Sequence, residues 1–388
     1  MNIATRSLET SVDLAVDKVN LIHGGMEYFG LLKQLIRKAH HTIYIQTYIF
    51  EEDQTGTEVA NELKAAAQRQ VQVFLLVDGY ASGNLGKAFI KSMVEAGVNF
   101  RMFDPLLKSR YFYLGRRLHH KVVAIDSKYS LVGGINISDR YNDMPDHTAW
   151  LDWAVYAEGE VAEQLTKICH ARVKRASFKS FVNKKSNSSF VRNSHQVSVR
   201  INDWVRGKRE ITRSYLAMFR QARENIIILS AYFLPNDQFR TELKRAVKRG
   251  VKVQLILAGP SDVALAKYAE RYMYRWLVKN GIEIYEYQKS VLHGKMAMYD
   301  GKWATVGSYN VNNISAYASI ELNLAIDDHV FAKQVGVSLS NIMVHDCLRV
   351  TDEHIKHVSY IKRILQQGAY YAFRAMFFLF TFYFKKRQ

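Results

Sequence analysis

The sequence predicts an α/β fold made of two copies of one unit, and three observations support this prediction. Helical segments alternate with short apolar strand-like segments in both halves, which is typical of α/β units with mostly parallel sheets. A short polar motif occurs once in each half with the same internal spacing. Each half also contains a helix that ends at a glycine directly before a strand, at Gly97 and at Gly281.

The first copy begins with an amphipathic helix over residues 31–39, which leads into a strand over 42–50. A second helix over 58–68 precedes a strand over 71–78, whose apolar residues are typical of a buried strand. A further helix ends at residues 96–97, and the chain then continues toward the strand that carries the first motif.

The second copy repeats this order of elements. A helix over 215–222 leads into a strand over 226–233, and a helix over 240–248 leads into a strand over 251–258. The next helix ends at residues 280–281, before the strand that carries the second motif. Two such units predict two lobes with a sizeable core each.

The repeated motif reads His-x-Lys-x4-Asp and is followed by Gly-Gly-x-Asn or Gly-Ser-x-Asn. Its first copy consists of His119, Lys121, Asp126 and Asn136, and its second copy of His293, Lys295, Asp300 and Asn310. The offset from histidine to asparagine is the same in both copies, which makes coincidence a poor explanation. Side chains two positions apart on a strand point to the same face, so the histidine and lysine of each copy are predicted to face one cleft.

These residue types can handle a phosphate without a metal ion. One imidazole can attack phosphorus and form a phosphohistidine, while the second gives and takes protons. The lysines and the asparagine amides can hold the phosphate oxygens as charge develops. The sequence has no Walker-type glycine loop and no carboxylate cluster for Mg²⁺, so we expect no metal and no cofactor, and nucleotide-dependent phosphoryl transfer is excluded.

Two acidic residues lie downstream of the motifs at similar offsets. Asp152 and Glu321 both stand in apolar, strand-like segments. A histidine needs a partner on its second ring nitrogen to fix its orientation, and these acids are candidates for that part. The alternative is that each is a buried acid paired with backbone donors or an arginine.

Composition limits the partners. The net charge of +18 over 388 residues indicates a polyanionic partner, which could be nucleic acid, an anionic membrane surface or a phosphate-bearing substrate. Cys169 and Cys347 lack CxxC spacing, and we interpret them as packed free thiols in a reducing compartment. Residues 1–6 show no signal peptide.

Three segments outside the repeats carry further predictions. Residues 369–384 are apolar and aromatic and precede a basic run, so they predict an interfacial helix on a membrane, too short at about 24 Å to cross one. The alternative is a helix packed on the core. The basic and aromatic segment 106–117 predicts a lip for anionic headgroups, or else a solvated loop. The polar segment 183–196 predicts the inter-lobe linker.

The duplicated motif resembles the phospholipase D superfamily and, within it, bacterial cardiolipin synthases without an N-terminal transmembrane hairpin. The resemblance covers residues 17–350 and includes the segments 44–53, 71–80, 133–138, 231–235 and 292–295. It implies two pseudo-symmetric α-β-α sandwich lobes with one shared active site. The lobes would span 1–182 (motif 114–141) and 197–350 (motif 287–314), joined by the linker and followed by a membrane-associating tail over 351–388.

The resemblance also implies a role for each site residue. One histidine would be the nucleophile, His119 by family habit, and the other, His293, the acid and base. Lys121, Lys295, Asn136 and Asn310 would bind phosphate. Asp126 and Asp300 belong to the signature but would support a loop. Glu321 would orient His119 and Asp152 would orient His293, each across the lobes.

Two features depart from the family pattern. His120 stands beside the candidate nucleophile, where such synthases often have arginine, and strand alternation predicts that it points away from the cleft. Ser319 and the pair Asn312-Asn313 replace the more usual residues after the second motif.

The function that the resemblance implies is phosphatidyl transfer of the cardiolipin synthase type, in which two phosphatidylglycerols give cardiolipin and glycerol. One monomer would suffice for the active site, on the cytoplasmic side of the cell membrane, with anionic phospholipids as partners and nucleic acid not expected. One alternative is a phospholipase D-type phosphodiesterase or nuclease. Another is a catalytically silent protein that binds lipid or a polyanion.

Overall fold

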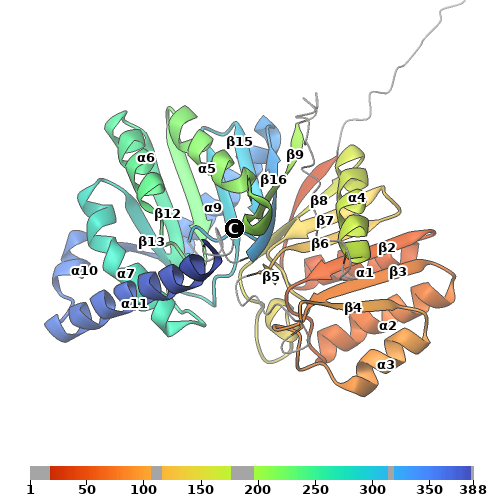
Figure 1. Cartoon of the computed structure of the whole chain (residues 1–388). Helices are drawn as coiled ribbons and strands as arrows, with labels where there is room; N and C mark the ends of the chain where they lie inside the picture. The colour runs from red at the N-terminus through yellow and green to blue at the C-terminus, as the bar shows by residue number, and fades with distance from the viewer. Residues whose placement is uncertain (1–17, 106–115, 176–195, 313–318, 386–388) are drawn as a thin grey trace, which may run out of the picture.

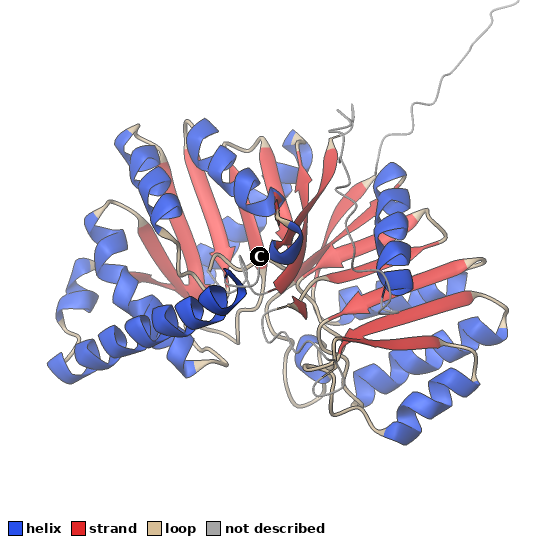
Figure 2. Ribbon diagram, in the orientation of Figure 1, coloured by secondary structure: helices blue, strands red, loops and turns tan. Residues whose placement is uncertain are grey.

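The computed structural model describes residues 18–105, 116–175, 196–312 and 319–385, and within them the chain forms two lobes, each built on one sheet (Figure 1). The predicted linker 183–196 lies almost entirely outside these residues, as does nearly all of the basic and aromatic segment 106–117. Each lobe has helices on both faces of its sheet, so the predicted α/β fold with two sandwich lobes is confirmed (Figure 2).

The first sheet has seven strands in the order β1-β8-β7-β6-β2-β3-β4. They are β1 (Val19–His23), β2 (Thr42–Thr47), β3 (Gln72–Asp78), β4 (Asn99–Phe103), β6 (Lys121–Ile125), β7 (Tyr129–Gly133) and β8 (Trp153–Glu158). Helices α1 (Met26–Lys38), α2 (Gln54–Gln68) and α3 (Lys87–Glu95) share one apolar cluster with one face of this sheet. Helix α4 (Glu160–Arg175) packs into a different cluster on the other face.

The second sheet runs in the order β10-β9-β16-β15-β14-β11-β12-β13-β17. Its strands are β9 (Val197–Asp203), β10 (Lys208–Arg209), β11 (Asn225–Ser230), β12 (Lys252–Ala258), β13 (Glu283–Tyr287), β14 (Lys295–Tyr299), β15 (Trp303–Gly307), β16 (Ser319–Ile326) and β17 (Cys347–Val350). Helices α5 (Glu210–Gln221), α6 (Asp237–Lys248) and α7 (Ala264–Lys279) cover one face. Helix α9 (His329–His345) covers the other.

The inner faces of the two sheets share a single core. Its apolar cluster contains Trp153 of the first sheet, Leu229 and Val306 of the second, and side chains of both α4 and α9. The short strand β5 (Arg117–Leu118) crosses from the first lobe and pairs in parallel with β16 of the second sheet. The lobes are therefore joined both by apolar packing and by backbone hydrogen bonds.

The prediction of mostly parallel sheets is wrong, because most neighbouring strands in each sheet are antiparallel. Strands β2, β3 and β4 are parallel, as are β11, β12 and β13, because helices connect them. In each lobe the motif strand is antiparallel to the strand that follows it because a short turn connects the two. The next strand is antiparallel as well. Asp126 and Ser127 form the turn from β6 to β7 with φ values of 52° and 55°, which suit a tight hairpin.

The C-terminal segment begins its helix earlier than predicted. The last helix, α11, spans Tyr360–Lys385 and follows the short helix α10 (Asp352–Lys356). Two one-turn helices occur earlier in the chain, η1 (Asp139–Tyr141) and η2 (Trp204–Arg206). Ala369 is buried in the core beside α7, and the Tyr370 ring lies 4.8 Å from that of Tyr272. Residues 369 and 370 thus pack against α7, whereas the apolar side chains of the first turns of α11 are exposed. Among the described residues, none of the helices meets the length and apolarity required to cross a membrane.

Candidate active site

Each motif histidine is positioned by a strand of the opposite lobe. The His119 backbone N–H donates to the Ile320 carbonyl at 3.1 Å, and the His293 backbone N–H donates to the Leu151 carbonyl at 2.9 Å. Pairing of β5 with β16 produces the first contact, and an isolated bridge between Leu151 and Leu292 produces the second. Because Ile320 and Leu151 directly precede Glu321 and Asp152, each histidine is set beside an acid of the other lobe.

The two imidazole–carboxylate pairs close across the lobes. Nδ1 of His119 lies 2.9 Å from the Glu321 carboxylate, and Nδ1 of His293 lies 2.6 Å from Oδ2 of Asp152. A carboxylate accepts hydrogen bonds, so each neutral imidazole carries its proton on Nδ1 and keeps the lone pair of Nε2 for chemistry. The structure thus brings together the four residues that the sequence singled out as two pairs.

Glu321 is fully buried and has two hydroxyl donors besides His119. Ser308 Oγ donates to Oε2, and Ser319 Oγ donates to Oε1 at 2.6 Å. Burial acts to raise the pKa of Glu321, but His119, Lys121 and Ser308 together outweigh it, and the pKa is lowered overall. Glu321 is therefore ionised and can stabilise a cationic imidazole.

Asp152 is held by close backbone packing. The Trp153 N–H donates to Oδ1 of Asp152 at 2.7 Å. A Cβ atom on Gly134 would lie only 2.4 Å from the same oxygen, so glycine is required there for the carboxylate to keep its place. Burial acts to raise the pKa of Asp152, but His293 and Lys295 outweigh it, and the pKa is lowered overall.

Burial favours the neutral form of both histidines. Burial lowers the pKa of His119, Glu321 opposes this effect, and Lys121 adds to it. Burial and the charge of Lys295 lower the pKa of His293, against the hydrogen bond to Asp152. A bound phosphodiester would bring a negative charge close to both rings and raise both pKa values. One ring can then be protonated while the other stays a nucleophile.

The two motif lysines are buried, and each amine donates to the backbone carbonyl of its own motif histidine. Lys121 Nζ lies 2.5 Å from the His119 carbonyl oxygen, and Lys295 makes the same contact with His293. Burial, and then repulsion from Lys295, lowers the pKa of Lys121 to about 7, and burial lowers that of Lys295 to about 8. An anion between the two amines would relieve their repulsion and restore their charge.

Each of the two motif asparagines has one buried amide atom without a hydrogen-bond partner among the described residues. Asn136 accepts from the Ile49 N–H at 3.0 Å through Oδ1, and its buried Nδ2 has no hydrogen-bond partner among the described residues. In Asn310 the buried atom without a described partner is Oδ1. Asn136 can offer its amine to a phosphate oxygen directly, whereas Asn310 would first have to rotate its amide.

The signature aspartates lie outside this site and bind backbone N–H groups, as expected for residues that support a loop. Asp126 stands at the far end of β6 from His119, and its carboxylate accepts three backbone N–H groups of residues 40–42 at 2.8 Å each. Asp300 holds residues 223–225 in the same way, at 2.8 to 2.9 Å. Both acids fix the turn between a helix and the central strand.

His120 points away from the catalytic pairs. Its Nε2 lies 2.8 Å from Oε1 of Gln46, and burial lowers its pKa well below the usual value. The equivalent position in the second motif is Gly294, where a Cβ atom would lie 2.9 Å from the Trp153 ring. Leu229 and Trp153 thus leave no room for a side chain at Gly294, whereas the first motif has room for the His120 imidazole.

Sequence reasoning missed the residues that surround the histidines. The Tyr48 ring packs edge-on against His119 at 4.9 Å, and the Tyr141 ring against His293 at 5.0 Å. Ser308 occupies the position of Gly134 in the second motif, a difference that could have indicated a distinct contact to the acid. The described residues contain no group of three or more His, Cys, Asp or Glu side chains arranged for a metal ion.

Comparison with known proteins places these features in a family. The family described as "Cardiolipin synthase, PLD-like domain" matches residues 32–171 and 215–343. Cardiolipin synthase B of Escherichia coli K12 is 33% identical over 87% of this chain and 83% of its own length. The probable cardiolipin synthase YwiE of Bacillus subtilis is 29% identical over 84% of this chain and 64% of its own length.

Solved structures share the fold at low sequence identity. Phosphatidylserine synthase of Haemophilus influenzae superposes with a TM-score of 0.73 at 14% identity, over 92% of this chain and 93% of that one. Polyphosphate kinase of Porphyromonas gingivalis superposes with a TM-score of 0.60 at 15% identity, over 92% of this chain and 53% of its own.

Proposed function

The chain belongs to the family of cardiolipin synthases with a PLD-like domain, and on that premise we propose that it is a phosphatidyltransferase that makes cardiolipin. Two phosphatidylglycerols would give cardiolipin and glycerol. The observation that carries the proposal is the mirrored pair of buried histidine–carboxylate contacts beside two buried lysines.

In the first step, Nε2 of His119 attacks the phosphorus of one phosphatidylglycerol. A nitrogen–phosphorus bond forms, and the bond from phosphorus to the headgroup glycerol oxygen breaks. His293, protonated beside the bound phosphate, gives its proton to that oxygen, and glycerol leaves. Glu321 stabilises the positive charge that grows on His119.

In the second step, His293 acts as the base. It takes the proton from a headgroup hydroxyl of the second phosphatidylglycerol, whose oxygen attacks the phosphorus. The nitrogen–phosphorus bond breaks, cardiolipin is released, and His119 returns to its neutral form. Asp152 stabilises His293 each time that it carries the proton.

Lys121, Lys295 and Asn136 would hold the phosphate oxygens during both steps. Their donors are in place before substrate binds, which is the arrangement that stabilises charge developing in a transition state. One chain supplies both half-sites, so a monomer would be sufficient.

Transfer to a lipid alcohol requires access to a membrane surface. Exposed apolar side chains stand on the first turns of α11, among them Tyr360 at 77% and Ile361 at 71% exposure. We expect this helix to lie in the interface of the membrane on its cytoplasmic side, next to anionic lipids.

An assay with purified protein and phosphatidylglycerol vesicles tests the reaction. We expect cardiolipin and glycerol in equal amounts. Phosphatidic acid without cardiolipin would refute the synthase and leave a lipase.

Trapping of the phosphoenzyme with labelled lipid tests which histidine is the nucleophile. Label should appear in the unsubstituted protein, remain detectable in His293→Ala and be absent from His119→Ala. Label that persists in His119→Ala would assign the nucleophile to His293.

A further inference from the structure

A cavity of about 1140 Å³ lies on the second lobe, and none of the motif residues lines it. It is bounded by α7, β17, α10 and the first turns of α11. We call it the basic groove, because its walls carry Arg271, Arg275 and Lys279 of α7, Lys356 of α10, and Lys362 and Arg363 of α11. Three carboxylates, Glu286, Asp352 and Glu353, line it as well.

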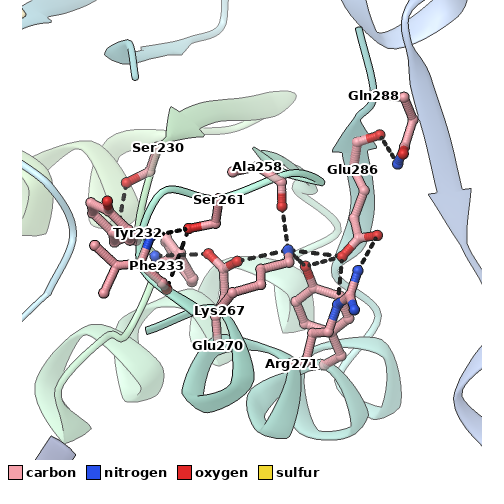
Figure 3. A network of polar contacts seen from close by, with 12 residues as sticks. Ser230, Tyr232, Phe233, Ala258, Ser261, Lys267, Glu270, Arg271, Glu286 and Gln288 are labelled. Carbon is pink, nitrogen blue, oxygen red and sulfur yellow. Dashed lines mark hydrogen bonds and ion pairs between the residues drawn. The ribbon is translucent and has the colours of Figure 1, made fainter. Parts of the chain in front are cut away.

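The carboxylate on the floor of the groove is already neutralised. Glu286 lies 2.8 Å from Lys267 and 3.2 Å from Arg271, and it accepts the Tyr274 hydroxyl at 2.8 Å. Lys267 in turn pairs with Glu270 at 3.0 Å (Figure 3). The carboxylate on the floor is therefore satisfied within a buried network, and the remaining acids of the groove, Asp352 and Glu353, stand on α10 at its wall.

The walls, in contrast, carry basic side chains that form no ion pair with another described residue. Arg275, Lys279 and Lys356 are exposed, and none of them forms an ion pair with another described residue. Arg363 is fixed, since it donates to the carbonyls of Ile355 and Lys356. The groove thus presents several free cations around a fixed frame, which is the arrangement that binds a phosphate.

Exposed apolar side chains flank the groove. On α11 they are Tyr360, Ile361, Ile364 and Leu365, each at least half exposed, and Leu348 of β17 is 47% exposed. A nucleic acid would offer these side chains no apolar partner. A bilayer offers them the boundary between headgroups and acyl chains, directly beside the phosphates that the cations would contact.

We propose that the basic groove binds the phosphate headgroup of an anionic phospholipid at the bilayer surface, separately from the catalytic site, while the apolar side chains of α11 insert beside it. The lipid held there is an anchor and undergoes no reaction. The proposal deepens the membrane association proposed above, and it does not depend on the transfer chemistry.

Flotation of the full chain with vesicles tests this. Vesicles of equal parts phosphatidylcholine and phosphatidylglycerol are compared with phosphatidylcholine alone. The triple variant Arg275→Gln/Lys279→Gln/Lys356→Gln should lower the partition coefficient on the anionic vesicles by about a hundredfold, since each basic residue at such a surface contributes roughly a fivefold factor. Binding to phosphatidylcholine should not change.

Two matched variants separate the groove from net charge and from misfolding. Lys244→Gln/Lys248→Gln/Lys333→Gln removes the same charge from exposed positions on α6 and α9 and should change binding less than about threefold. Arg275→Lys/Lys279→Arg/Lys356→Arg keeps the charge and should keep binding. Equal losses in both glutamine triples would overturn the proposal.

Further arms identify the ligand. Thermal stabilisation by soluble glycerol phosphate that is lost in the groove triple would assign the site to a free phosphate compound and overturn the lipid assignment. Groove-dependent binding of duplex DNA with unchanged vesicle binding would overturn it too. The same flotation in the His119→Ala chain should give undiminished binding, so a failure of the transferase proposal remains distinguishable from a failure of this one.

Discussion

The two half-sites place equivalent histidines beside equivalent acids, but they do so with different packing. In one, Glu321 receives hydrogen bonds from two serine hydroxyls, Ser308 and Ser319. In the other, Asp152 rests against Gly134, and besides His293 the Trp153 N–H is its one hydrogen-bond donor among the described residues. Both histidine–carboxylate contacts have the same geometry. The two acids differ in the hydrogen bonds that they accept from residues other than the histidine. The difference teaches that one arrangement of atoms can be reached by hydrogen bonding or by close approach.

Exchange of each acid for its amide should have the largest effect. We expect Glu321→Gln and Asp152→Asn each to lower kcat by about a thousandfold or more, because an amide cannot stabilise the imidazolium. The loss should be greater at Asp152, because Glu321 shares its charge with two hydroxyls. The rate of cardiolipin formation measures both variants, with circular dichroism as the control for folding. Losses below tenfold in both would contradict the orienting roles.

Exchange of the residues that support the acids should sharpen the comparison. Gly134→Ser places a Cβ atom 2.4 Å from the Asp152 carboxylate, and we expect about a hundredfold lower kcat because the acid must move away from His293. Ser308→Gly removes one of two hydroxyl donors and should cost about tenfold. Equal effects of the two substitutions would show that the half-sites are supported alike.

The pH dependence should separate the two lysines. Lys121, with a pKa of about 7, loses its charge before Lys295, with a pKa of about 8. Each amine is positive only below its pKa, so kcat/KM should fall as the pH rises from about 7 to about 9, by up to about tenfold. Bound phosphate restores the charge, so kcat at saturation should change less.

Replacement of one lysine by arginine tests this assignment. Lys121→Arg should reduce the fall of kcat/KM near pH 7, and Lys295→Arg should reduce it only near pH 8, because a guanidinium stays charged. A kcat/KM that is constant over this range would contradict the lowered lysine pKa values.

The smallest effect on activity is expected at the positions that follow the histidines. Gly294→Ala brings a methyl group within 2.9 Å of the Trp153 ring and should lower the free energy of unfolding by about 1–3 kcal/mol. His120→Ala leaves the buried Oε1 of Gln46 without its partner and should lower the free energy of unfolding by a similar amount. Urea denaturation measures both. We expect kcat of His120→Ala to stay within about threefold, and a much larger loss would mean that His120 takes part in the chemistry.

The sequence predicted the site better than it predicted the sheet. His119, Lys121 and Asn136 lie close together in the sequence, and their spacing is repeated in the second half of the chain. The motif could therefore be recognised from the sequence alone. The antiparallel part of each sheet begins at a tight turn such as Asp126-Ser127, and such a turn gives a weaker sequence signal than a helix between two strands. The start of α11 at Tyr360 was missed because the apolar pattern becomes continuous only at residue 369.

The contacts between the two lobes could not be predicted from the spacing of residues in the sequence. Pairing of Glu321 with His119 came from the family resemblance, and no periodicity links residues so far apart. Ser308 meets Glu321 because β15 ends beside β16, and Ser319 stands two positions before Glu321 on β16. The basic groove could not be predicted from the sequence either, because its basic residues come from three helices that only the fold brings around one cavity.

The exchange of strands between the lobes has a consequence for how the halves could diverge. A chain with a single motif would have to complete its site by pairing with an identical copy, and every substitution would then appear in both halves at once. Gly134 and Ser308 could not coexist in such a dimer, nor could Asp152 and Glu321. Fusion of the copies in one chain frees each histidine to acquire its own surroundings, so one can specialise in bonding to phosphorus and the other in carrying a proton.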